Sequence, residues 1–212
     1  MKTNIAVLVS GGGTNLQALI DAQQRGELGG GEITAVISTK EGAYALERAK
    51  KAGIAGYVIP RKAYASNQAM TVALVEQLRA LDIHLVVLAG CMVIFTHELV
   101  DSYPNAIMNV HPALIPSFCG KGFYGLHVHE AALAYGVKLS GATVHFVSEE
   151  CDGGPIIAQK AVAVMEDDTP ETLQKRIMEE AEWKLLPEAV SLFCQGRLSV
   201  EGRKVVISEG ER

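Results

Sequence analysis

Short apolar runs alternate along the chain with segments whose apolar residues recur every three or four positions. In the first half, nearly uninterrupted apolar runs cover residues 5–9, 33–37, 57–59 and 85–88. Between these runs the period is helical, as in the segment that contains Leu16, Leu19 and Ile20. Strands that are apolar throughout are covered on both faces, and helices between them allow parallel neighbours. The pattern therefore predicts an α/β fold, a doubly wound, mostly parallel sheet with helices on both faces.

The second half of the chain predicts further strands and a long helix. Apolar strands are expected at 106–111 and 141–147, and residues 197–207 read as a terminal hairpin. Thr169 and Pro170 are typical of a helix start, as the capping residue and the first helical position. We expect Pro187 to kink or restart this helix, because proline lacks the backbone N–H that a helix interior needs.

Composition narrows the class of protein. The chain has 212 residues, of which 49% are hydrophobic and 20% charged, enough for one core. With no repeat or linker, we expect a single domain over 1–212, made of a Rossmann-like, phosphate-binding half (1–100) and a second half (101–212). Lys and Arg total 19 against 24 Asp and Glu, a net charge of -5 without basic runs, which argues against a nucleic-acid partner.

The N-terminus and the cysteines suggest a cytoplasmic protein. The first apolar run is too short for a leader or a membrane span, so no membrane association is expected. The four cysteines show no C-x-x-C spacing, which suggests neither a zinc knuckle nor a redox pair. Unpaired, reduced thiols are consistent with the cytoplasm.

The strongest candidate site lies where the strand before Pro112 ends. Asn109 and His111 are two residues apart, so their side chains share one face of the strand, which Pro112 then terminates. Ligands bind at this edge of α/β sheets, and an amide beside an imidazole offers a hydrogen-bond donor and a group that titrates near neutrality. The alternative is a histidine satisfied by backbone at a turn.

A glycine turn follows the first strand and predicts an anion site. Residues 10–15 read Ser-Gly-Gly-Gly-Thr-Asn and place backbone N–H groups at a helix N-terminus. The dinucleotide fingerprint is absent, because Leu16 stands where its third glycine should be, and no Walker lysine follows. Thr14 and Asn15 add side-chain donors, which favours a phosphomonoester. The turn could alternatively serve only strand–helix packing.

Two further segments complete the candidate site. Met92 to Phe95 form an apolar loop that could wall a pocket for a flat ring, or could simply be core. Asp152 lies on a glycine-supported turn, and its carboxylate near His111 would raise the pKa of the imidazole and tune it as a general acid.

The remaining candidates are weaker. The glycine-rich connection after His111 is long and suggests a mobile flap whose Lys121 could reach an anion, although a solvated lysine is the simpler interpretation. No metal site is expected, because His127 and His129 lack the His-Glu-x-x-His spacing and His145 lies on a strand that can hold it as a group supporting the site. A nucleophilic Cys119 is not favoured, because nothing visible would lower its pKa.

Taken together, five motifs resemble one enzyme family, the phosphoribosylglycinamide formyltransferases. They are Ser10-Gly-Gly-Gly-Thr-Asn-Leu, Leu88-Ala-Gly-Cys-Met, Asn109-Val-His-Pro-Ala-Leu-Ile-Pro, Gly125-Leu-His-Val-His and Asp152-Gly-Gly-Pro-Ile-Ile. The resemblance implies transfer of a formyl group from 10-formyltetrahydrofolate, as co-substrate, to the amine of glycinamide ribonucleotide. The products would be formylglycinamide ribonucleotide and tetrahydrofolate, in purine biosynthesis. It also implies no metal and a monomer or homodimer.

The resemblance assigns a role to each matching position. The catalytic residues would be Asn109, His111 and Asp152; the ribonucleotide would contact Gly13, Thr14, Asn15 and Glu182; the folate would contact Met92, Val93, Ile94, Phe95, Asn109, Asn67 and the turn at 147–152. Val93 and Asn67 stand where many members carry a basic residue. Attack of the amine on a formamide creates an oxyanion that Asn109 and a protonated His111 would stabilise.

Two alternatives to this function are kept open. A formyltetrahydrofolate hydrolase shares the Asn-x-His and Asp motifs but usually has an N-terminal regulatory domain, whereas this chain enters its first strand at once. A non-catalytic nucleotide-binding module would need only the glycine turn. A methionyl-tRNA formyltransferase is not favoured, because it should carry a basic C-terminal domain.

Overall fold

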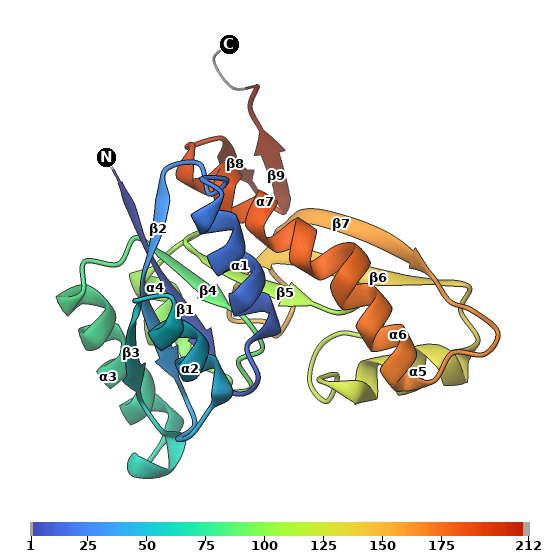
Figure 1. Cartoon of the computed structure of the whole chain (residues 1–212), viewed down its shortest axis with the longest axis horizontal. Coiled ribbons are helices and arrows are strands. Elements are labelled where there is room, and N and C mark those ends of the chain that lie inside the picture. The colour runs from blue at the N-terminus through green and yellow to red at the C-terminus, as the bar shows by residue number, and fades with distance from the viewer. Residues whose placement is uncertain (1, 210–212) are drawn as a thin grey trace.

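The computed structural model describes residues 2–209 and contains one nine-stranded sheet, in the order β3-β2-β1-β4-β5-β6-β7-β9-β8. The strands are β1 (Thr3–Val9), β2 (Gly31–Ser38), β3 (Ala55–Val58), β4 (Leu85–Leu88), β5 (Ile107–His111), β6 (Leu139–Phe146), β7 (Ile156–Ala163), β8 (Leu198–Glu201) and β9 (Lys204–Ile207). Figure 1 shows the first five strands in the blue-to-green part of the molecule and the long β6 and β7 extending away from them.

The first five strands form the parallel part of the sheet, with β1 at its centre. Alternate residues of β1 face opposite sides, so Ile5 and Val7 belong to one core and Ala6 and Leu8 to another. All four are fully buried. Helices therefore cover both faces, which confirms the predicted doubly wound α/β fold.

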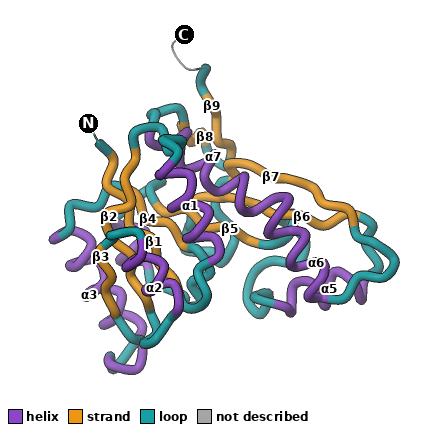
Figure 2. The backbone as a smooth tube through the Cα atoms, viewed as in Figure 1, coloured by secondary structure: helices purple, strands orange, loops and turns teal. Residues whose placement is uncertain are grey.

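The helices are distributed between these two faces and the far end of the sheet. They are α1 (Thr14–Gln24), α2 (Tyr44–Lys51), α3 (Asn67–Ala80), α4 (His97–Ser102), α5 (Leu126–Tyr135), α6 (Pro170–Ile177) and α7 (Trp183–Cys194), with a 3-10 turn at Arg61–Ala63. Helices α1, α2 and α7 pack on the Ile5 face, and α3 and α4 on the opposite face. Figure 2 shows α1 and α7 side by side, and α5 with α6 at the far end.

The sheet changes direction after β5. Strand β6 runs antiparallel to β5, and β7 antiparallel to β6, whereas the strand pairings among β1 to β5 are parallel. The predicted terminal hairpin is confirmed as β8 and β9, which pair in antiparallel register. The change matters for function because β6 places its side chains directly beside the end of β5.

The long C-terminal helix is irregular at a different place from the predicted one. It continues through Pro187, while a π-helical turn at Met178–Glu182 separates α6 from α7. Pro187 has no N–H to donate to the carbonyl of residue 183. The π-helical turn, which is wider than an α-helical one, ends directly before residue 183. None of the helices within residues 2–209 is long and apolar enough to cross a membrane.

Candidate active site

The glycine turn after β1 forms the start of α1. Gly13 precedes the helix with a φ of 72°, a left-handed conformation that favours glycine. A Cβ built on Gly13 would lie 2.6 Å from the Cβ of Ala45 on α2, so a side chain does not fit. Gly11 and Gly12 are exposed, so the turn presents backbone to solvent at a helix N-terminus, as the anion-site prediction requires.

Asn15 and Glu182 meet beneath this turn, although 167 positions separate them in the sequence. The Nδ2 of Asn15 donates to the Oε2 of Glu182 at 2.6 Å, and the two residues are 9% and 5% exposed. Burial raises the pKa of Glu182 to about 7, although the hydrogen bond from Asn15 opposes the shift. The π-helical turn carries Glu182, so the irregular part of the C-terminal helix brings this carboxyl group to the start of α1.

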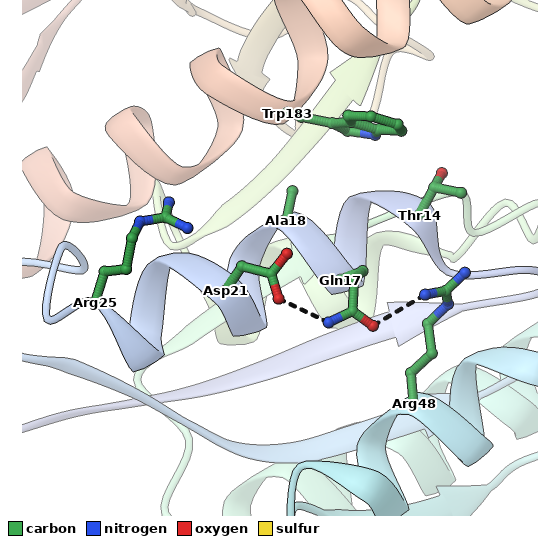
Figure 3. Close-up of a pocket in the computed structure, with 7 residues that line it drawn as sticks. All are labelled: Thr14, Gln17, Ala18, Asp21, Arg25, Arg48 and Trp183. Atoms are coloured by element: carbon green, nitrogen blue, oxygen red, sulfur yellow. Dashed lines mark hydrogen bonds between the residues drawn. The ribbon is translucent and has the colours of Figure 1, made fainter.

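A cavity extends from the glycine turn along α1 (Figure 3). Helices α1, α2 and α7 line it with Thr14, Gln17, Ala18, Asp21, Arg25, Arg48 and Trp183. In Figure 3 the indole of Trp183 lies on one side of α1, and the guanidinium of Arg48 lies on the other, near the first turn of the helix. The space beside Thr14 is therefore bounded by an aromatic ring and a cation.

The predicted Asn109 and His111 lie at the end of β5, and a third polar side chain joins them from β6. Asn109 is opposite His145 in the antiparallel register, and its Nδ2 lies 3.2 Å from the His145 Nε2. The His145 Nδ1 lies 2.9 Å from the carbonyl oxygen of Phe146 and donates to it, which leaves Nε2 to accept from the amide. His145 therefore fixes the orientation of Asn109.

Asp152 reaches the same cluster from the turn between β6 and β7. Its Oδ2 lies 3.6 Å from the His111 Nδ1, and its Oδ1 lies 3.7 Å from the His145 Nε2. The backbone N–H of Gly120 donates to Oδ2 at 2.9 Å. The structure thus brings together Asn109, His111 and Asp152, as the sequence predicted, and adds His145 and the Gly120 amide.

The connection from Pro112 to Gly125 closes over His111. The carbonyl oxygen of Phe118 lies 2.8 Å from the His111 Nε2, so this nitrogen carries a proton and donates to it. Phe118 has a φ of 50°, which is uncommon for a residue other than glycine. Lys121, which the sequence suggested for an anionic ligand, is exposed on this connection.

The predicted upward pKa shift of His111 is wrong. Burial lowers the pKa of the imidazole, and this effect exceeds the opposing charge of Asp152 and the hydrogen bond to Phe118. Burial would raise the pKa of Asp152, but the neighbouring imidazole of His145, the hydrogen bond from the Gly120 N–H and the charge of His111 together hold it below its ordinary value. The cluster therefore combines a neutral imidazole with an ionised carboxylate near neutral pH.

His129 is fully buried on α5. His129 was assigned no role from the sequence, because its spacing does not suit a metal ligand. Neither of its ring nitrogens has a hydrogen-bond partner among the described residues. Burial, and then the charge of His111, lowers its pKa to about 4. Within residues 2–209 no three His, Cys, Asp or Glu side chains gather closely enough to hold a metal ion.

The loop predicted to contact the folate follows β4, the strand that pairs with β5 and so lies next to Asn109. Met92 and Ile94 are 63% and 60% exposed, whereas Val93 and Phe95 pack against the core on the α3 face. The backbone N–H of Met92 donates to the Ser10 Oγ at 2.9 Å, which joins the loop to the start of the glycine turn. The Nδ2 of Asn67 donates to the carbonyl oxygen of Ile94 at 3.3 Å, so Asn67 contacts the loop as well.

The cluster contains contacts that the sequence did not predict. They are the pairing of His145, which was expected only as a supporting group, with Asn109, and the backbone groups of Gly120 and Phe118. His145, Gly120 and Phe118 touch the cluster through strand register or through a backbone group, and neither leaves a local sequence signal. The spacing of Asn109 and His111 could be read from one strand. The pairing of Asn109 with His145 required the register between β5 and β6.

Comparisons with known proteins show which family this chain belongs to. A family model described as formyl transferase matches residues 3–190. The chain is 40% identical over 198 residues to the chloroplastic phosphoribosylglycinamide formyltransferase of Arabidopsis thaliana, covering 93% of this chain and 67% of that protein. The corresponding enzyme of Haemophilus influenzae is 40% identical over 197 residues, covering 93% of this chain and 90% of that protein.

Solved structures show the same similarity. Glycinamide ribonucleotide transformylase 1 from Symbiobacterium toebii superposes with a TM-score of 0.93 at 45% sequence identity. The superposition covers 98% of this chain and 95% of the solved one.

Proposed function

We propose that this chain, which belongs to the formyl transferase family, transfers a formyl group from 10-formyltetrahydrofolate to the amine of glycinamide ribonucleotide. The products are formylglycinamide ribonucleotide and tetrahydrofolate. The observation that carries the proposal is the cluster of Asn109, His111 and Asp152 at the end of β5. The neighbouring strands β4 and β1 end in the exposed apolar loop and in the glycine turn, so all three lie along one edge of the sheet. We assign the phosphate site to the half at 1–100 and the catalytic residues to the half at 101–212.

The glycine turn and the Asn15–Glu182 pair form the acceptor side. Gly13 and Thr14 offer backbone N–H groups at the start of α1, where the helix dipole favours a phosphate. Glu182 lies beneath them, on the π-helical turn, and its carboxyl oxygens suit the hydroxyl groups of a ribose. The unpartnered Oδ1 of Asn15 is a further acceptor at this position.

The loop from Met92 to Phe95 forms the donor side. Its exposed Met92 and Ile94 side chains fit the flat, largely apolar ring system of a folate, and the loop is held from both sides by Ser10 and Asn67. The bound 10-formyltetrahydrofolate supplies the formyl group. With Val93 inside the loop and Asn67 beside it, neither residue offers a charge to the acidic tail of the folate.

The catalytic residues act on charge and on a proton. The Asn109 Nδ2 donates one N–H to His145 and makes a long hydrogen bond of 3.5 Å to the Asp152 Oδ1 with the other. The formyl oxygen can replace Asp152 in this long contact as negative charge develops there. His111 is neutral because of its burial, and it can accept the proton that the attacking amine loses. The Asp152 carboxylate then stabilises the imidazolium. The imidazolium gives the proton to N10 of the folate as the bond between N10 and the formyl carbon breaks, and tetrahydrofolate leaves.

Two features of the site prepare this chemistry. Substrate must replace the Phe118 carbonyl at the His111 Nε2, so the connection from Pro112 to Gly125 has to move before the proton transfer. The imidazole then carries its proton on Nδ1, which faces Asp152, and Nε2 accepts the proton of the amine. No covalent nucleophile is needed, because holding the amine and the formyl group in line lowers the activation free energy by roughly several kcal/mol.

Release of tetrahydrofolate from 10-formyltetrahydrofolate tests the proposal directly. Purified protein should release it only when glycinamide ribonucleotide is present, at a rate that saturates with the ribonucleotide. Equal release without the ribonucleotide would identify a formyltetrahydrofolate hydrolase instead. No release in either condition would contradict a formyl transfer to this acceptor and would favour a binding module.

A further inference from the structure

Three successive carbonyl groups of the glycine turn are each held by a defined donor. The carbonyl oxygen of Gly11 accepts from the Ala45 backbone N–H at 3.1 Å. The carbonyl oxygen of Gly12 accepts from the Arg48 Nε at 2.8 Å, and that of Gly13 from the Gln17 N–H at 2.9 Å. Two of the three donors belong to α2, a helix that the proposed function leaves without a role.

The carbonyl contacts fix where the amide N–H groups of the turn point. In a planar trans peptide the C=O and the N–H of the same unit point in opposite directions. Because α2 holds the carbonyls of Gly11 and Gly12, the N–H groups of Gly12 and Gly13 turn away from α2. An exposed glycine turn without these contacts could rotate its peptides and present carbonyl oxygens, which repel an anion, at the same position.

Arg48 is the side-chain component of this clamp, and it is itself held in place. Its guanidinium also donates through Nη1 to the Oε1 of Gln17 at 2.9 Å and lies 5.1 Å from the centre of the Tyr44 ring. Figure 3 shows this guanidinium beneath the first turn of α1, on the same cavity as Thr14. A guanidinium has five N–H groups, so the two that are used leave three for a ligand or water.

We propose that Arg48 is the positioning residue for the acceptor phosphate: it orients the Gly12–Gly13 peptide so that its N–H faces the anion, and its fixed positive charge acts on that anion from the far side of the peptide. The inference rests on the proposed function, because the phosphate is that of the ribonucleotide. The other arginine on the cavity does not have this geometry. Arg25 lies at the opposite end of α1 and pairs with Glu27 at 2.7 Å.

Steady-state kinetics of two Arg48 variants test the inference. Arg48→Met removes both the hydrogen bond to Gly12 and the charge, whereas Arg48→Lys retains the charge without the planar donor group. Hydrogen bonds to charged groups correspond to about a 10- to 100-fold change in affinity. We therefore expect KM for glycinamide ribonucleotide to rise about 10- to 100-fold in Arg48→Met, and by less in Arg48→Lys, with kcat and the KM of the folate within about twofold of the original protein.

A matched control and a second acceptor distinguish positioning from a general loss of structure. Lys51→Met removes an exposed cation that lies 5.9 Å from the same Tyr44 ring without contacting the turn, so it should leave both KM values unchanged. The dephosphorylated acceptor, glycinamide ribonucleoside, should be used equally well by the original protein and by Arg48→Met, because it carries no phosphate for the turn to bind.

Two results would overturn the inference. One is an unchanged KM for glycinamide ribonucleotide in Arg48→Met. The other is an equal loss with the nucleoside, which would show that Arg48 supports the fold alone. Both presuppose that the unaltered protein formylates the ribonucleotide, so absence of that activity would instead contradict the proposed function.

Discussion

The glycine turn and the cluster proposed to be catalytic, Asn109, His111 and Asp152, handle charge by opposite means. The turn is exposed and offers backbone N–H groups, which cannot titrate and need only the correct peptide orientation. The cluster is buried and uses side chains whose protonation depends on one another, with His111 4% exposed beside Asp152. A binding site can thus rely on backbone where no proton moves, whereas the catalytic site needs titratable groups and a defined dielectric environment.

The two regions also differ in what holds them together. The turn depends on one neighbouring helix, α2, which contacts it through Ala45 and Arg48. The cluster depends on the register of β5 and β6 and on two separate loops, which supply the Gly120 amide and Asp152. We therefore expect substitutions at the turn to affect the acceptor KM, and substitutions in the cluster to affect kcat.

The largest effect is expected in the cluster. His111→Ala and Asp152→Ala should each lower kcat by at least about a hundredfold, because general acid–base catalysis contributes this much or more, while the acceptor KM stays close to its original value. Tetrahydrofolate release at saturating substrate measures the effect. His127→Ala is the control, since His127 is exposed and pairs with Glu130 away from the cluster. Near-normal rates in both cluster variants would contradict the proposed mechanism.

A smaller effect is expected at the turn. Gly13→Ala places a side chain at a φ of 72° and within 2.6 Å of the Ala45 Cβ, so α2 and the turn must separate. We expect a loss of about 1–3 kcal/mol in the free energy of unfolding, measured in urea, together with a higher acceptor KM. Gly12→Ala meets no atom within 4 Å and should change stability by less than about 1 kcal/mol. Equal behaviour of the two variants would show that the contact with α2 does not matter.

The effects expected to be smallest per pH unit concern the pH dependence of stability, which has opposite signs for Glu182 near the turn and for His129 on α5. The pKa of Glu182 is raised from 4.5 to about 7, so its contribution is complete below pH 4.5 and is lost as the pH rises towards 7. The pKa of His129 is lowered from 6.5 to about 4, so its contribution is complete above pH 6.5 and is lost as the pH falls towards 4.

Two variants separate these contributions. Glu182→Gln should remove the loss of stability on the alkaline side, and His129→Leu the loss on the acidic side, each by up to about 1.4 kcal/mol per pH unit. Urea unfolding between pH 4 and 8 measures both slopes. Parallel stability curves for a variant and the original protein would show that the substituted group does not titrate in the expected range.

The sequence by itself determined the parts of this protein that depend on neighbours along the chain. The apolar strands and their helices predicted the doubly wound sheet, because the period of hydrophobic residues decides which faces are buried. The turn at Gly11 to Gly13 was visible for the same reason, since strand, glycines and helix start follow one another directly. The pairing of Asn109 and His111 on one face needed only the twofold period of a strand.

Only the tertiary structure decided which distant groups meet. His145 reaches Asn109 through the antiparallel register of β5 and β6, Glu182 reaches Asn15 across 167 positions, and Arg48 reaches Gly12 from another helix. The direction of the His111 pKa shift was likewise decided only by the tertiary structure. A nearby carboxylate raises the pKa and burial lowers it, and the sequence contains the carboxylate but not the depth of burial that outweighs it.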